Sequence, residues 1–235
     1  MSVLVLSLFP GIGLLDMAFE EEGFCVVRGP DLLWGGDIRR FHPPAGNFDG
    51  VIGGPPCQAF SVMQFAVPQR PTENLIPEFE RCVIEAEPTW FLMENVRRAP
   101  EPTVHGYIVK SLLFNNRWTG AEQNRERRFS FGSRDGRAIH PEFAALEAFE
   151  WEYAVVGGHG GIDHGRQKWG QGTQNPKKMA RLQGLAEDFF AGSPFTVHAQ
   201  RKMLGNGVPL PMGRAVARAV KKTLGVGAAA RTSES

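Results

Sequence analysis

One short apolar run, together with the loop that ends it, constrains the fold of this chain more than any other feature. The run is Phe48–Ile52, and Gly53-Gly54-Pro55-Pro56-Cys57 follows it directly. Apolar and β-branched residues predict a buried strand, and the glycines and prolines end that strand in a rigid loop. Reactive groups in open α/β sheets lie at this end of a strand. Cys57 is therefore a candidate nucleophile, although a cysteine that merely packs in the loop has the same pattern.

The first residues of the chain predict a strand, a glycine turn and a helix. Val3–Leu8 reads as a buried strand, Phe9–Gly13 as a turn with two glycines, and Leu14–Glu20 as an amphipathic helix. Glycines let a ligand approach the backbone closely, and the first turn of a helix offers free N–H groups. This unit suits a bound nucleotide, and a plain tight turn is the alternative.

Acidic residues follow two other predicted strands. Asp31 comes after the strand Phe24–Val27, where such folds place an acid that binds a ribose. Glu94 comes after the strand Thr89–Met93. Both acids are expected at the edge of the sheet where ligands bind. A helix cap or an ion pair is the alternative role for Glu94. For Asp37, six residues beyond Asp31, the alternative is a helix cap or a turn residue.

The second half of the chain mixes regular and irregular segments. Helices are predicted over Glu78–Ala86, Val104–Phe114, Glu142–Phe149 and Met212–Leu224. Between them, Gln123, Arg125 and Arg127 alternate along an extended segment and would share one face. Three such donors suit phosphates, a ribose or a base, whereas a solvated edge strand is the alternative.

Residues 157–172 form a glycine-rich, polar stretch that cannot build a core but can fit a groove. Arg166 and Lys168 make it locally basic, although the whole chain carries a net charge of only +1. Its two histidines, His159 and His164, lack further ligands and make a poor zinc site. We therefore expect any nucleic-acid contact to be local, and no bound metal.

Composition excludes several classes of protein. Three cysteines at scattered positions fit a reducing compartment and offer no Cys-x-x-Cys pair for zinc. No apolar run is long enough to span a membrane, and acidic residues follow the apolar first residues too closely for a signal peptide. We expect a cytoplasmic, monomeric protein with no membrane partner.

Seven short motifs, taken in order, resemble those of the cytosine-C5 methyltransferases of DNA. They are Phe9-Pro-Gly-Ile-Gly13, Gly36-Asp-Ile38, Pro55-Pro-Cys-Gln-Ala-Phe-Ser61, Glu94-Asn-Val96, Gln123-Asn-Arg-Glu-Arg127, Arg181-Leu-Gln-Gly184 and Gly205-Asn-Gly-Val-Pro209. Each motif alone is a weak signal, but their order is a strong one. The resemblance implies an α/β fold with a Rossmann-like sheet that binds S-adenosylmethionine, plus a small, loop-rich target-recognition region that reads double-stranded DNA.

The resemblance also implies roles for single residues. The catalytic residues would be Cys57, Glu94, Arg125 and Arg127. Residues near the cofactor would be Phe9, Gly11, Gly13, Asp31, Asp37, Ile38, Pro55, Asn206 and Val208. DNA contacts would come from Gln58, Ser61, Gln123, Arg166 and Lys168. In this chemistry the cysteine adds to C6 of a cytosine flipped out of the duplex, while the glutamate holds the N3 edge of the base.

The resemblance divides the chain into a catalytic core (1–132), a target-recognition region (133–178), a return to the core (179–224) and a flexible tail (225–235). Two departures from the family pattern stand out. Only five residues separate Asp31 from Asp37, so the helix usual at this place is missing. The recognition region is also short, which fits a short target sequence. Such economy suits a phage or mobile element, acting at the nucleoid of its host.

Other functions fit parts of the same pattern. An RNA cytosine-C5 methyltransferase would keep the fold, and the basic loop does not distinguish DNA from RNA. A DNA-binding module without catalysis would show changes at Cys57, Glu94 or Arg127, and the sequence has none. A nucleotide-dependent oxidoreductase would need a Gly-x-Gly-x-x-Gly turn, which is absent. Transfer of a group other than methyl from a modified sulfonium cofactor is also compatible with the sequence.

Overall fold

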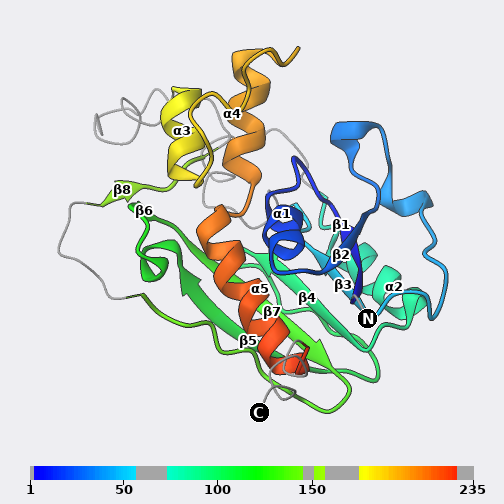
Figure 1. The fold of residues 1–235 in the computed structure, drawn as a ribbon. Helices are drawn as coiled ribbons and strands as arrows, with labels where there is room; N and C mark the ends of the chain where they lie inside the picture. The colour runs from blue at the N-terminus through cyan, green and yellow to red at the C-terminus, as the bar shows by residue number, and fades with distance from the viewer. Residues whose placement is uncertain (1–2, 57–72, 145–150, 157–174, 227–235) are drawn as a thin grey trace, which may run out of the picture.

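The computed structural model describes residues 3–56, 73–144, 151–156 and 175–226 (Figure 1). Within these residues, six strands form a mixed sheet in the order β2-β1-β3-β4-β7-β5. The strands are β1 (Leu4–Leu8), β2 (Cys25–Arg28), β3 (Gly50–Gly53), β4 (Trp90–Asn95), β5 (Ile108–Asn115) and β7 (Glu126–Ser133). The first four are parallel, and β7 runs antiparallel to β4 and β5. The predicted α/β fold class and the four strands predicted before residue 100 are confirmed.

Helices cover both faces of the sheet, and apolar side chains alternate between those faces. The covering helices are α1 (Leu14–Glu21), α2 (Ile76–Ala86) and α5 (Leu210–Leu224). Ile52 and Leu92 belong to the cluster that α1 and α5 complete, whereas their neighbours Val51 and Phe91 belong to the cluster under α2. α1 and α5 lie side by side on one face (Figure 1). Burial on both faces explains why the sequence shows continuous apolar runs rather than alternation.

A smaller lobe lies beyond one end of the sheet (Figure 1). It consists of the helices α3 (Pro176–Leu182) and α4 (Val197–Asn206) and the strands β6 (Gln123–Asn124) and β8 (Glu152–Tyr153). α3 packs on α4, and Leu182 and Leu204 bury against Leu14 and Ala18 of α1. The lobe is therefore fastened to the helix that starts at the glycine turn.

Short 3₁₀ helices complete the described elements. They are η1 (Leu32–Trp34), η2 (Ile38–Arg40) and η5 (Asn116–Thr119). Residues 31–37 are all described, and they contain no α-helix, as the short spacing predicts. Strand β2 is consequently an edge of the sheet. Among the described residues, no helix has the length and hydropathy that crossing a membrane would need.

One helix prediction is wrong, and another lies largely outside the described residues. Instead of a helix over Val104–Phe114, Ile108–Asn115 forms strand β5, which pairs with β7 along its whole length. Gly106, with a φ of +82°, turns the chain into this strand. Pairing with β7 overrides the helical spacing of the apolar residues. The helix expected over Glu142–Phe149 falls mostly on residues 145–150, outside the described part of the chain.

Candidate active site

The carboxyl ends of β3 and β4 meet the amino-terminal half of β7 at one edge of the sheet. Gly53 of β3 pairs with Met93 of β4, and Asn95 of β4 pairs with Arg128 of β7. The chain leaves β3 through Gly54–Pro56, and the next residue is the expected nucleophile. That cysteine and the rest of its loop, up to residue 72, lie outside the described residues. At this end of the sheet, the start of the cysteine loop therefore lies beside the expected acid of β4.

Glu94 is buried at this edge in an ion pair with Arg127. The Arg127 Nε atom lies 2.9 Å from Glu94 Oε1, and both side chains are largely shielded from solvent. The second carboxylate oxygen, Oε2, would lie 3.1 Å from a Cβ atom at Gly54. A glycine at this position keeps the loop close above the carboxylate. The expected acid and its arginine are thus in contact, directly beneath the start of the cysteine loop.

Burial raises the pKa of Glu94, and it outweighs the charges of Arg127 and Arg125, which act in the opposite direction. A carboxyl with a raised pKa keeps its proton at a higher pH than an exposed glutamate does. The group is therefore suited to donate a proton or a hydrogen bond to a base placed above it, with Arg127 holding its other oxygen.

Asn95, the neighbour of Glu94 on β4, ties the cysteine loop to the sheet. Its buried Nδ2 donates to the Pro55 carbonyl at 3.1 Å, and its Oδ1 accepts from the Val96 amide at 2.8 Å. The sequence comparison with the methyltransferase motifs includes Asn95 but gives it no role. The structure makes it a positioning residue, since it fixes the backbone two residues before the expected nucleophile.

Arg125 is buried and fastens the small lobe to the core. Its Nη1 donates to the Val155 carbonyl at 2.5 Å, and its Nη2 donates to the carbonyls of Gly205 and Gly207 at 2.9 and 3.1 Å. The charge of Arg125 also acts on Glu94, against the effect of burial on the pKa of that carboxyl. The described contacts therefore support the loop-holding role of Arg125, and the direct contact with Glu94 comes from Arg127.

Gln123 does not point to solvent, and the expectation that it contacts DNA is corrected. Its side chain is fully buried, and its Nε2 donates to the Leu182 carbonyl at 2.6 Å. Its Oε1 accepts from the Val155 amide at 3.1 Å. Gln183 completes this network by donating to the carbonyls of Leu204 and Gly207. A buried glutamine needs several partners, and Gln123 donates to Gln183 Oε1 at 3.0 Å as well.

On the cofactor side, the glycine turn is tied to the end of β2. Asp31 Oδ2 accepts from the Gly11 amide at 2.9 Å, and Trp34 Nε1 donates to the Gly11 carbonyl at 2.7 Å. Phe9 and Gly13, on either side of Gly11, have positive φ angles of +56° and +80°, respectively. A Cβ atom at Gly11 would meet nothing within 4 Å. The turn thus leaves an open place next to a carboxylate and an indole.

Asp37 and Ile38 lie at the start of η2, between β2 and β3. Asp37 caps this short helix through the Arg39 amide at 3.0 Å and pairs with the Arg39 guanidinium at 2.8 Å. The hydrogen bond from the Arg39 side chain is the main reason why the pKa of Asp37 is lowered. Ile38 is buried in the core. The capping role that was the alternative for Asp37 is therefore present, and its carboxylate stays partly exposed.

Asn206 and Val208 are brought to the glycine turn by close packing of their loop. A Cβ atom at Gly207 would lie 2.6 Å from Leu14 Cδ1, so the loop presses directly on the first residue of α1. Val208 is buried beside it, and Asn206 is exposed at the end of α4. These residues and the Phe9–Gly13 turn, predicted separately, thus lie together.

A buried carboxylate that sequence reasoning missed supports the same turn. Asp16 of α1 is fully buried, accepts from Ser7 Oγ at 2.5 Å and pairs with Arg28 Nε at 3.0 Å. Arg28 also lies against Gly13, where a Cβ atom would be 2.9 Å from Nη2. Desolvation raises the pKa of Asp16, against the effects of Ser7 and Arg28. The network joins the ends of β1 and β2 to the first turn of α1.

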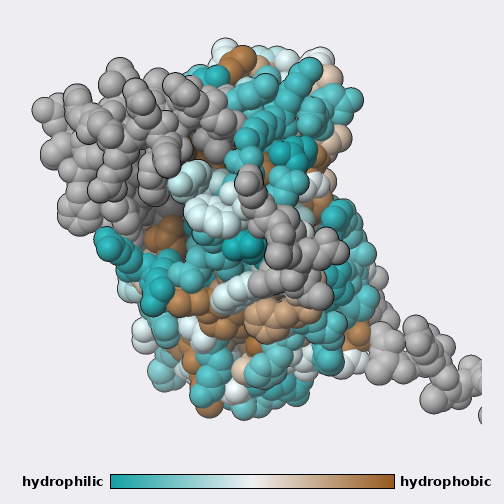
Figure 2. All heavy atoms as spheres, turned by 90° about the vertical axis from the view of Figure 1, so that its left-hand side faces the viewer, coloured by the Kyte–Doolittle hydropathy of each residue, from teal (hydrophilic) through white to brown (hydrophobic). Residues whose placement is uncertain are grey.

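Several expected DNA contacts lie outside the described residues. They are Gln58, Ser61, Arg166 and Lys168. On the side of the molecule that carries β6 and β8, apolar residues gather in patches among hydrophilic ones (Figure 2). Exposed aromatic side chains in this part of the chain include Phe143, Trp151 and Tyr153. Among the described residues, no group of three or more His, Cys, Asp or Glu side chains could hold a metal ion.

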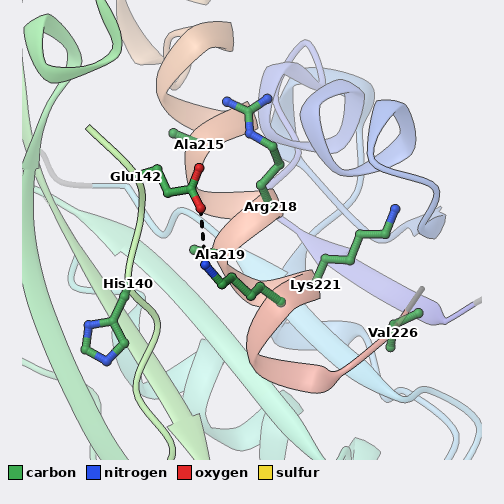
Figure 3. A pocket seen from close by; sticks show the side chains of 8 residues that line it. His140, Glu142, Ala215, Arg218, Ala219, Lys221 and Val226 are labelled. Carbon is green, nitrogen blue, oxygen red and sulfur yellow. Dashed lines mark hydrogen bonds and ion pairs between the residues drawn. The ribbon is translucent and has the colours of Figure 1, made fainter. Parts of the chain in front are cut away.

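A hollow of about 310 Å³ lies between α5 and the segment that carries His140 and Glu142 (Figure 3). Its lining includes Glu142 and the α5 residues Arg218, Lys221 and Lys222. Arg218 and Lys221 bind Glu22, which follows α1 and precedes β2. The amino ends of the parallel strands lie on this side, so the hollow is remote from Glu94. Its cations are engaged by Glu22 and Glu142, and it plays no part in the candidate site.

The sequence profile described as C-5 cytosine-specific DNA methylase matches residues 35–156. Because this match covers more than half of the chain, the chain belongs to the C-5 cytosine-specific DNA methylase family.

Individual relatives agree with this assignment. The chain is 35% identical over 199 residues to Type II methyltransferase M1.HphI of Haemophilus parahaemolyticus, covering 67% of this chain and 52% of that protein. It is 28% identical over 162 residues to Type II methyltransferase M.HgiDI of Herpetosiphon aurantiacus, covering 56% of this chain and 52% of that protein. The chain thus spans about half the length of these curated relatives.

A solved structure shares the fold. The Entamoeba histolytica methyltransferase EhMeth superposes with a TM-score of 0.68 and 12% sequence identity, over 95% of this chain and 99% of that one. At this identity the likeness shows the fold alone. It extends over the sheet and the small lobe together.

Proposed function

We propose that the chain transfers a methyl group from S-adenosylmethionine to C5 of cytosine in double-stranded DNA. The observation that carries the proposal is the buried Glu94–Arg127 pair beneath Gly54, at the start of the loop that leads to Cys57. Family membership and the names of the type II relatives support cytosine in DNA as the substrate. Residues 133–178 would recognise the target, while residues 1–132 and 179–224 would form the catalytic core and 225–235 a tail.

Cytosine C5 is a poor nucleophile, so the base must first be activated. In the proposed mechanism the Cys57 thiolate bonds to C6, and the electrons of the C5–C6 double bond become available at C5. The Glu94 carboxyl donates a proton to N3 as charge develops on the ring, and Arg127 keeps that carboxyl in place. After C5 has gained the methyl group, a water molecule takes the C5 proton, the C5–C6 double bond forms again as the Cys57 thiolate leaves, and N3 returns its proton to Glu94. The base must be flipped out of the duplex to expose C6.

The residues around the glycine turn fit the proposed cofactor. Gly11 leaves open space at the turn, and the Asp31 carboxylate beside it can accept from ribose hydroxyls. The Asp37 carboxylate would accept from the adenine amino group, and Phe9, Gly13, Ile38, Pro55, Asn206 and Val208 would line the remaining walls. Bound there, the sulfonium of S-adenosylmethionine would supply an electrophilic methyl group.

Trapping with 5-fluorocytosine tests the mechanism. Fluorine at C5 cannot leave as a proton does, so a duplex that contains the fluorinated base should remain covalently attached to the protein on a denaturing gel. The adduct should require S-adenosylmethionine and should be absent from Cys57→Ser, because a hydroxyl is far less ionised than a thiol. An adduct that persists in Cys57→Ser would overturn the mechanism.

The other two cysteines provide the controls. Cys25 is exposed on the edge strand β2, and Cys25→Ser should trap normally. Burial raises the pKa of the Cys82 thiol to about 11, which keeps it protonated and unreactive near neutral pH. Mapping of the adduct to either of these residues would contradict the assignment of Cys57.

Mass spectrometry of nucleosides separates the remaining alternatives. Host DNA and host RNA, each incubated with the protein and S-adenosylmethionine, are digested and searched for 5-methylcytosine. The proposal expects the product in DNA. A product in RNA alone would identify an RNA methyltransferase, a different mass at C5 would identify another transferred group, and no product in either pool would indicate a binding module.

A further inference from the structure

The chain makes a rigid turn directly after Glu94 and Asn95. The Ala99 amide donates to the Val96 carbonyl at 3.0 Å and closes the turn. Arg128 of β7 then donates through Nη1 to the Ala99 carbonyl and through Nη2 to the Arg97 carbonyl. One guanidinium thus fixes two carbonyls of this turn, and the backbone of the turn is held against the sheet.

Two arginine side chains project from this fixed backbone. Arg97 and Arg98 are both exposed. The Arg97 side chain keeps 69% of its accessible surface, and its ion pair with Glu126 is long, at 3.5 Å. Exposed pairs of this length contribute little, so Arg97 remains available to another anion. Within the described residues, the Arg98 side chain has neither an ion pair nor a hydrogen bond.

The turn lies at the edge of the sheet that carries the candidate site. Arg97 is three residues beyond Glu94 and two beyond Asn95, which holds the Pro55 carbonyl of the cysteine loop. Any cytosine above Glu94 stays attached to its sugar and phosphates, because flipping rotates a nucleotide without cutting the strand. The phosphates that flank a flipped base must therefore pass close to this edge.

We propose that Arg97 and Arg98 bind phosphates of the DNA strand that carries the target cytosine. The inference rests on the proposed function of the site. A guanidinium matches the geometry of a phosphate, and arginines on a backbone that is already ordered lose less entropy on binding. Contacts of this kind set the register of a protein on DNA without reading its sequence. The turn would thus place the strand so that the target base reaches Glu94.

The salt dependence of DNA binding tests this inference. A fluorescein-labelled duplex is titrated with the full chain, with the double variant Arg97→Ala/Arg98→Ala, and with a control, at salt concentrations between about 50 and 200 mM. Each lost phosphate contact should lower the slope of log Kd against log salt by about one. We therefore expect a slope lower by about two and an affinity at the lowest salt that is weaker by at least tenfold.

The control removes two positive charges from α5, remote from Glu94. Arg218→Ala/Lys222→Ala alters the α5 cations that line the hollow in Figure 3, so it changes the net charge by the same amount. Its slope should match the unmodified chain. If both double variants lower the slope by the same amount, general charge explains the effect and the inference is wrong. If neither variant lowers the slope, Arg97 and Arg98 are merely solvated, and the inference is wrong as well.

Activity distinguishes a failure of this inference from a failure of the proposed function. Formation of 5-methylcytosine in duplex DNA is measured at saturating S-adenosylmethionine with increasing DNA. The Arg97→Ala/Arg98→Ala variant should need more DNA for half-maximal rate while its melting temperature stays within a few degrees. If the unmodified chain methylates no DNA, the proposed function has failed. If it methylates DNA and the variant needs no more DNA, only the phosphate-binding role has failed.

Discussion

Two groups of buried polar side chains lie at one end of the sheet, and their hydrogen bonds differ. In the first, Gln123, Arg125 and Gln183 donate to main-chain carbonyls of the small lobe and of the loop after α4. In the second, Glu94 has one strong partner, the Arg127 Nε atom, and its other oxygen faces the start of the cysteine loop. The side chains of the first group donate their hydrogen bonds to the protein backbone. In the second group, one oxygen of Glu94 can still bond to a substrate.

The difference separates structural from reactive polar groups. Carbonyls that accept from a buried side chain are fixed by the fold, so a network that ends on them stabilises the arrangement of the two lobes. Burial raises the pKa of Glu94, so its ionisation costs stability, and a perturbed carboxyl with one oxygen facing the start of the cysteine loop is typical of a functional site. Removing a member of the first group should therefore affect folding, and removing a member of the second should affect catalysis.

The largest expected effect follows from Glu94→Gln. Glutamine keeps the shape of the side chain but cannot deliver a proton to N3. We expect the rate of 5-methylcytosine formation to fall about a thousandfold, with the melting temperature changed by only a few degrees. Mass spectrometry of the product and a thermal scan of both proteins check this. A rate within tenfold of the unmodified chain would contradict the role of Glu94.

Arg125→Met should lower the free energy of unfolding by about 3 kcal/mol, because three buried carbonyls lose a charged donor. Urea denaturation followed by circular dichroism measures this loss. The matched variant Arg127→Met should cost less stability, since Glu94 can take up a proton once the arginine is gone. It should instead lose more activity. Equal destabilisation by the two variants would erase the distinction between the two groups.

Much of the sheet and the order of the motifs follow from the sequence. The strands β3 (Gly50–Gly53) and β4 (Trp90–Asn95) are buried on both faces, and apolar runs in the sequence predict such strands. Glu94 and Arg127 come together because the motifs lie at strand ends, where the topology determines the neighbours. The motif order also predicts that Asn206 and Val208 lie near the glycine turn, which the packing of Gly207 on Leu14 explains.

Other features depend on contacts that local sequence does not contain. Ile108–Asn115 becomes a strand because β7 lies beside it, and the spacing of its apolar residues alone resembles a helix. Gln123 alternates with Arg127 in the sequence, but the small lobe covers Gln123 and leaves Arg127 at the site. The role of Arg128 in fixing the turn after Asn95 likewise requires knowing which strand pairs with β4.

Asn95→Ala should lower activity about tenfold while DNA binding stays the same. The variant loses the hydrogen bond to Pro55, so the loop that carries the nucleophile is held less well. The control is Asn115→Ala, which removes an amide that bonds to Asn124 at the end of β5. Steady-state rates and duplex titrations measure both variants. Equal losses of activity in the two would show that Asn95 acts through stability alone.

The pH dependence distinguishes the two groups further, because only Glu94 titrates. Burial raises its pKa above the ordinary value of 4.5, so the folded protein holds a proton that the unfolded chain releases. Its contribution to stability is complete below that ordinary value and is lost as pH rises through the raised pKa. Activity should fall over the same interval as the proton is lost. Urea titrations at several pH values give the free energy of unfolding as a function of pH. This free energy should change less with pH in Glu94→Gln than in the unmodified chain, and an equal pH dependence in the two proteins would contradict the prediction.

The smallest expected effect concerns Asp37, where a cap and a ligand contact are combined in one side chain. Asp37→Ala should weaken the binding of S-adenosylmethionine about fivefold, as the loss of one exposed hydrogen-bond acceptor would. Arg39→Ala is the matched control, because it removes the ion pair and leaves the carboxylate. If Asp37 only orders η2 through Arg39, both variants should bind the cofactor equally weakly in calorimetric titrations. If the carboxylate itself accepts from the adenine amino group, only Asp37→Ala should lose affinity, and the cofactor site would then contain a ligand-binding carboxylate whose pKa, unlike that of Glu94, is lowered by a hydrogen bond from Arg39.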